Sequence, residues 1–118
     1  MRPHKKLNIW EEAMMLIEEL YRMCLKLPKD ETYGISAQMK RASISVASNI
    51  AEGCARNSNK EKIQFFMMAR GSLSELDAQI EICLRLNFIQ QVDYDKLLKH
   101  VEKTSSMLQG LIDSRRHT

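Results

Sequence analysis

The sequence has few glycines and prolines, and this scarcity argues against a fold built mainly from β-strands. Its 118 residues include 4 glycines and 2 prolines. Many strands joined by tight turns would need more of these residues, because glycine and proline supply the backbone geometry of such turns. Methionine is frequent at 8, and Leu, Ile, Ala, Glu and Lys dominate the rest. That composition favours helix, and the length is that of one domain.

Cysteine is also sparse, with one residue each at Cys24, Cys54 and Cys83. No two are close enough for a CxxC motif or for Cys/His zinc spacing. We interpret Cys24 and Cys83, which have apolar neighbours, as small core residues of a reduced, cytoplasmic protein. We expect no signal peptide, since an amphipathic segment follows the first six residues directly. No apolar run approaches the roughly 20 residues that span a bilayer, so no membrane association is predicted.

The motifs of several enzyme classes are missing. There is no phosphate-binding glycine loop, no dinucleotide-binding glycine motif and no G-x-S-x-G nucleophile elbow. Di-iron bundles use Glu-x-x-His pairs, but none of His4, His100 and His117 follows a glutamate by three residues. The sequence therefore predicts no enzyme, no metal site and no cofactor.

Apolar residues repeat at alternating steps of three and four, which is the period of an amphipathic helix. The first segment shows this at Trp10, Ala13, Ile17, Leu20 and Cys24. The pattern predicts helices over about 7–27, 33–54, 60–87 and 94–114. Short connections make an all-α, antiparallel up-down-up-down four-helix bundle in a single domain, 1–118, the expected fold.

Local signals define the ends of these segments. Pro28 is expected to end the first helix, and Gly53 with the Arg56-Asn57-Ser58-Asn59 stretch is expected to mark the end of the second and a short loop. Thr32, either Ser58 or Asn59, and Asp93 are the expected N-caps of the second, third and fourth helices.

Two segments are more apolar than one core requires. In the third helix the expected core residues are Phe65, Ala69, Ser72, Leu73, Leu76, Ile80, Cys83 and Leu84. A second strip there contains Met67, Met68, Gly71, Ala78 and Ile82, and the first helix has a comparable strip at Met14, Leu16, Tyr21 and Met23. Such strips indicate a contact between subunits.

One polar row borders the apolar stripe of the second helix. Gln38, Arg41, Ser45, Asn49 and Glu52 fall within roughly an 80° arc at about 100° per residue. A row beside the core is partly buried and needs partners, for which Ser72 and Glu75 are candidates, with Gly71 allowing close approach. It is either a binding or catalytic site or a structural network. We favour the network, because buried polar groups are normally hydrogen-bonded for structural reasons.

The same row carries a family resemblance. Gln38-Met-Lys-Arg41-Ala-Ser-Ile-Ser45-Val-Ala-Ser-Asn49-Ile-Ala-Glu52-Gly53 resembles the signature of the 23S rRNA intervening-sequence protein family. Trp10, Ala13, Pro28, Glu31 and the Gly71-Ser72-x-x-Glu75 motif extend the resemblance over nearly the whole chain. Lys40-Arg41 stands where the family commonly has Arg-Arg, which keeps the charge.

The resemblance implies a four-helix bundle that assembles into a ring, typically a homopentamer, with no established activity. Accessory proteins of diversity-generating retroelements are similar in fold, and binding of nucleic acid and of a reverse transcriptase is attributed to them.

The formal net charge of +3 and the pI near 8.8 permit nucleic-acid binding without requiring it. One hypothesis is a homo-oligomer that binds RNA or other nucleic acid through phosphate contacts. Its expected contact residues are Lys5, Lys6, Arg56, Lys60, Lys62, Arg115 and Arg116. The alternative is a structural adaptor that docks a protein partner such as a polymerase, with the basic clusters as ordinary solvated surface.

Overall fold

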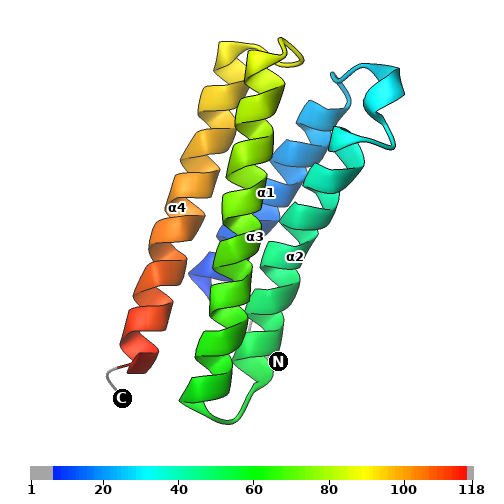
Figure 1. The fold of residues 1–118 in the computed structure, drawn as a ribbon. Coiled ribbons are helices and arrows are strands. Elements are labelled where there is room, and N and C mark those ends of the chain that lie inside the picture. Colours follow the sequence, from blue (N-terminus) through cyan, green and yellow to red (C-terminus); the bar gives the residue numbers. More distant parts are fainter. Residues whose placement is uncertain (1–6, 117–118) are drawn as a thin grey trace.

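Four long helices make up the structure, a computed structural model in which residues 7–116 are described. They are α1 (Asn8–Cys24), α2 (Ile35–Ala55), α3 (Asn59–Arg85) and α4 (Gln91–Arg116), and a 3-10 turn, η2 (Lys29–Glu31), lies between α1 and α2. Figure 1 shows them running alternately up and down. The expected all-α four-helix bundle is confirmed.

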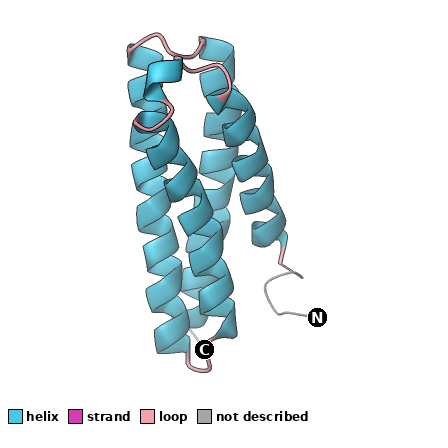
Figure 2. Cartoon of the chain, turned by 90° about the vertical axis from the view of Figure 1, so that its right-hand side faces the viewer, coloured by secondary structure: helices cyan, strands magenta, loops and turns pink. Residues whose placement is uncertain are grey.

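The helices stand at the corners of a square. Each packs on its neighbours in the chain, α1 also packs on α4, and the pairs α1–α3 and α2–α4 make no close backbone contact. The bundle is therefore elongated, with dimensions of 46 × 22 × 22 Å, and has four sides, each shared by two adjacent helices (Figures 1 and 2).

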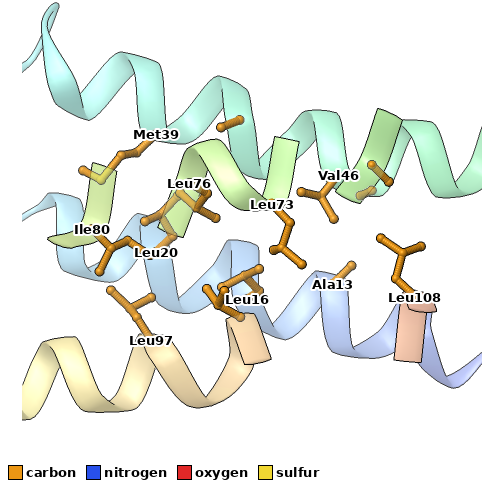
Figure 3. Close-up of a cluster of buried hydrophobic side chains, with 14 of the residues drawn as sticks. Ala13, Leu16, Leu20, Met39, Val46, Leu73, Leu76, Ile80, Leu97 and Leu108 are labelled. Carbon is orange, nitrogen blue, oxygen red and sulfur yellow. The ribbon is translucent and has the colours of Figure 1, made fainter. Parts of the chain in front are cut away.

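The core fills the centre of this square with aliphatic side chains from all four helices. Leu16, Leu20, Met39, Leu76 and Ile80 are almost fully buried, and Figure 3 shows how such side chains interdigitate between the ribbons. Fully burying one side chain of this kind stabilises the fold by about 1.5–3 kcal/mol.

Two details of the expected core were wrong. In α1, Leu16 and Met23 are buried while Trp10 and Ile17 lie at its edge, so the helix is rotated from the expected orientation. In α3, Phe66 rather than Phe65 is buried. Both errors arise where adjacent positions are apolar, because periodicity alone then fits two orientations of the helix equally well.

The helix ends follow the expected signals in part. Ser58 is the N-cap of α3, and its hydroxyl accepts the Glu61 N–H at 3.2 Å. Thr32 is not the cap of α2, because Gly34 holds that place and the Thr32 hydroxyl donates to the Lys29 carbonyl in η2. Asp93 lies inside the first turn of α4 rather than before it.

Gly53 has a packing role rather than the expected role of helix terminator. It lies inside α2, which continues to Ala55. A Cβ at this position would come within 2.4 Å of the Phe66 ring, and that ring is 1% exposed. Only glycine leaves space for the ring against the α2 backbone.

The α1–α4 side is held by ion pairs. The Glu12 side chain, 5% exposed, lies 2.7 Å from His100 Nδ1 and 3.6 Å from Lys103 Nζ. Glu19 pairs with Lys96 on the same side. The contact between Glu12 and His100 joins residues 88 positions apart.

Candidate functional site

One end of the bundle gathers most of the cations that the sequence nominated. The connection from α2 to α3 and the last turn of α4 lie at the same end (Figure 1). This places Arg56, Lys60 and Lys62 near Arg115 and Arg116. We call these five residues the basic end. Arg115 lies close enough to Cys54, in the last turn of α2, to act on that thiol. Lys5 and Lys6, also nominated, lie outside the described residues.

Two of these cations support the local structure. The Lys62 ammonium donates to the Cys54 carbonyl at 3.1 Å, so it satisfies a carbonyl at the C-terminus of α2. Arg56 pairs with Glu52 at 2.6 Å and lies over the Phe65 ring, 4.6 Å from its centroid. Lys62 and Arg56 keep their positive charges, but contacts within the protein fix the positions of their side chains.

The other cations are better placed to meet a partner. Lys60 and Arg116 are exposed and Arg115 is half-buried. Arg116 has a loose ion pair with Asp113 at 3.8 Å. Exposed cations such as Lys60 and Arg116 can contact phosphate oxygens without reading a base sequence.

The half-buried thiol of Cys54 at this end is not an activated nucleophile. Burial raises its pKa above the ordinary value, although Lys62 and Arg115 act in the opposite direction. A cysteine is reactive as the thiolate, and Cys54 is protonated at neutral pH.

The polar row on α2 is divided into two parts by the structure. In its centre the Ser45 and Ser72 hydroxyls lie 2.9 Å apart and join α2 to α3. Asn49 donates from Nδ2 to the Ser45 carbonyl at 2.9 Å and to its hydroxyl at 3.1 Å. These three residues form a compact, partly buried cluster. The hydrogen bonds of Ser45 join it to a hydroxyl and an amide, neither of which is a general base.

The remaining members of the row point outward. Gln38, Arg41 and Glu52 are exposed on α2, as is Glu75 on α3. Glu75 accepts a long hydrogen bond, 3.3 Å, from Gln79 Nε2. Sequence reasoning missed Gln79, which is 7% exposed and whose Oε1 is buried without a hydrogen-bond partner. The available signal was a polar residue at a core-facing position next to Ile80.

Other chemistry is sparse in the part of the chain that the structure describes. Between residues 7 and 116, no three His, Cys, Asp or Glu side chains gather to hold a metal ion. A surface groove of about 670 Å³ runs between α3 and α4, where Arg70 donates to Gln109 at 2.7 Å. None of the helices described is long and apolar enough to cross a membrane.

Comparison with known proteins supports the resemblance noted in the sequence. The model of the family described as 23S rRNA-intervening sequence protein matches residues 5–110. The crystal structure of a Bacteroides thetaiotaomicron protein of unknown function from the S23 ribosomal protein family superposes with a TM-score of 0.82 at 17% identity. The match covers 88% of this chain and 97% of that one, and at this identity it shows the fold alone. No curated protein matches significantly.

Proposed function

Because the chain belongs to the 23S rRNA-intervening sequence protein family, we propose that it is a non-enzymatic, homo-oligomeric protein that binds RNA through its basic end. The observation that carries this proposal is the convergence of five cations, from the α2–α3 connection and from α4, at one end of the bundle. Among the described residues, the Ser45 hydroxyl bonds to no general base and burial raises the pKa of the Cys54 thiol, which favours binding over catalysis.

Binding of this kind depends on phosphates. Lys60, Arg115 and Arg116 would replace counterions along the backbone, and each phosphate contact adds about 0.7–0.9 to the slope of log K against log salt. Arg56 lies over one face of the Phe65 ring at this end, so that face is not open to a stacking base. We therefore expect weak sequence preference and strong salt dependence.

Assembly into an oligomer would strengthen binding to phosphates. A ring of five, as the resemblance implies, would multiply the net charge of +3 fivefold and present the basic end once per subunit. Several weak contacts made together raise affinity without any new contact. The three free thiols suit a reducing compartment, so we propose a cytoplasmic location, where rRNA is present.

Fluorescence anisotropy with a labelled, structured rRNA fragment tests the proposal. We expect Lys60→Ala combined with Arg116→Ala to lower affinity at least tenfold at low salt and to reduce the salt slope. The control, Lys29→Ala combined with Lys99→Ala, removes the same charge from exposed positions away from the basic end. Equal losses in the two double variants, or binding insensitive to salt, would show that the basic end is not the contact.

A protein adaptor is the second candidate, favoured by two exposed methionines. Met67 and Met68 are 40% and 55% exposed on α3, and methionine suits adaptable protein contacts. A pull-down from nuclease-treated lysate should then return a partner such as a polymerase in fixed stoichiometry. If no protein is retained after nuclease treatment, this alternative fails.

A further inference from the structure

Two opposite sides of the bundle differ in exposed charge. The outward surface of α4 carries many charged side chains: Asp95, Lys96, Lys99, Glu102, Lys103, Asp113 and Arg116. On α2, Arg41 and Glu52 are the exposed charged residues. On α3, the outward row from Gln64 to Arg85 contains two charges, Glu75 near its middle and Arg85 at its end. Cores of protein interfaces are depleted in charge in the same way.

The α2–α3 side also has a second heptad pattern, which faces away from the core. On α3 it consists of Gln64, Met68, Gly71, Glu75, Ala78, Ile82 and Arg85, and on α2 of Ala37, Arg41, Ile44, Ser48, Ala51 and Ala55. Steps alternate between three and four, as in helices that pack on other helices. Met68, Ile82 and Ile44 are 55%, 45% and 46% exposed, and the space beside Gly71 is open. We call these two rows the outer seam.

One charged group of the outer seam lacks an ion-pair partner within the described part of the subunit. Arg41 makes no ion pair in the described structure, although Glu75 lies at nearly the same level. Their similar height along the bundle axis follows from the contact between Ser45 and Ser72. Arg41 lies one turn before Ser45 on α2, and Glu75 lies about one turn after Ser72 on α3. Because the two helices are antiparallel, both steps lead in the same direction. One surface thus offers both an unpaired cation and an anion.

From these observations we infer that the outer seam is the surface on which a second copy of this chain packs, with Arg41 of one copy pairing with Glu75 of the other. The inference rests on the self-association proposed above and names its surface. Because Arg41 lies on the α2 row and Glu75 on the α3 row, the α2 row of one copy can meet the α3 row of the next, which is the head-to-tail contact that a ring requires. A side of 46 × 22 Å offers about 1,000 Å², and a stable interface uses about 800 Å² per partner. The outer seam is poorly suited to RNA, because the Glu75 carboxylate lies at nearly the same height as Arg41, the cation near its centre, and would repel phosphate.

The first test is the mass in solution by light scattering. We expect the wild-type protein at a multiple of 13.7 kDa and Ala78→Glu at the monomer mass. Ser106→Glu, an exposed position on α4, is the matched control and should keep the wild-type mass. Circular dichroism establishes that both variants are folded. A monomeric wild type, or an Ala78→Glu variant that still assembles, would overturn the inference.

Charge exchange tests the pairing itself. Arg41→Glu and Glu75→Arg should each give monomers alone, and an equal mixture of the two should assemble again, because each then supplies the charge that the other lacks. Recovery in a mixture cannot come from a pair within one chain. Failure of the mixture to assemble, while the wild type does, would refute the Arg41–Glu75 contact.

Failure of this inference can be told apart from failure of RNA binding. An assembled wild type that ignores RNA would leave the seam intact and remove the proposed function. A monomeric wild type that binds RNA through Lys60 and Arg116 would support RNA binding by the basic end and overturn the inference about the outer seam. If RNA binding is lost in Ala78→Glu while the wild type is monomeric, the seam is an RNA surface and the inference is wrong.

Discussion

Replacing Gly53 by alanine should destabilise the protein, although alanine is the better helix former. In an α-helix, Gly→Ala is normally stabilising by about 0.5–1 kcal/mol. At Gly53 the added methyl would lie 2.4 Å from Cε1 and 2.7 Å from Cδ1 of Phe66. Because the ring is enclosed in the core, it cannot move aside freely.

The size of the effect follows from two opposing terms. Forcing an extra methyl into a packed core costs about 1–3 kcal/mol, and contacts this short place Gly53 at the upper part of that range. Subtracting the helix-propensity gain leaves a net loss of about 1–2 kcal/mol. An unfolding entropy of about 2.1 cal/mol/K per residue converts this loss into a decrease in Tm of about 4–8 °C.

Thermal and urea denaturation followed by circular dichroism measure this. Gly110→Ala is the control: nothing lies within 4 Å of its added Cβ, so it should stabilise by about 0.5–1 kcal/mol. Phe66→Leu should rescue part of the loss when combined with Gly53→Ala, because the smaller side chain frees space. Equal stabilisation by both alanine substitutions would refute the packing explanation for Gly53.

Three further predictions concern single residues. Asn87 has φ 61° after the last turn of α3, so Asn87→Val should lower the free energy of unfolding by about 1–2 kcal/mol, whereas Asn87→Gly should not, as urea titration will show. Burial raises the pKa of Cys83 to about 11, so it should resist thiol reagents at pH 8 until the protein is unfolded in guanidinium; rapid labelling of the native protein would contradict this. The hydrogen bond from Lys26 holds the pKa of Asp93 below its ordinary value, so its stabilisation is present above about pH 4 and lost as pH falls through the lowered pKa. The stability difference between wild type and Asp93→Asn should therefore shrink at acidic pH, and a difference that does not change with pH would contradict the assignment.

Much of the fold was accessible from the sequence because helix period and turn residues are local signals. The apolar stripe expected on α2 was Ile35, Met39, Ala42, Val46 and Ile50, and all of these except Ile35 are buried. Ser58 caps α3 as expected. The rotation of α1 was not accessible, since Trp10 and Ile17 have the same spacing as Ile9 and Leu16. Which row faces the core depends on how α4 packs, and periodicity does not contain that information.

The candidate sites divide in the same way. The proximity of Ser45, Asn49 and Ser72 could be anticipated from spacing within α2 and the antiparallel α3. The buried Glu12 and its partner His100 could not, because 88 positions separate them and both read as ordinary surface residues. Gln79 could be noticed in the sequence as a polar residue beside Ile80, but the sequence does not show that its Oε1 lacks a hydrogen-bond partner.

The ion pairs between α1 and α4 have a consequence for the order of folding. The α2 and α3 helices are separated by three residues, 56–58, and they meet through a small loop. The contact of α1 with α4 instead closes a loop that contains most of the chain. Forming it therefore costs more conformational entropy than forming any other contact between helices of the bundle. We therefore expect α2 and α3 to pair early and α1 to dock on α4 last. In native-state hydrogen exchange, the amides of α1 should then open at lower free energy than those of α2 and α3. The contact between the first and last helices would be the part of the bundle least protected against exchange.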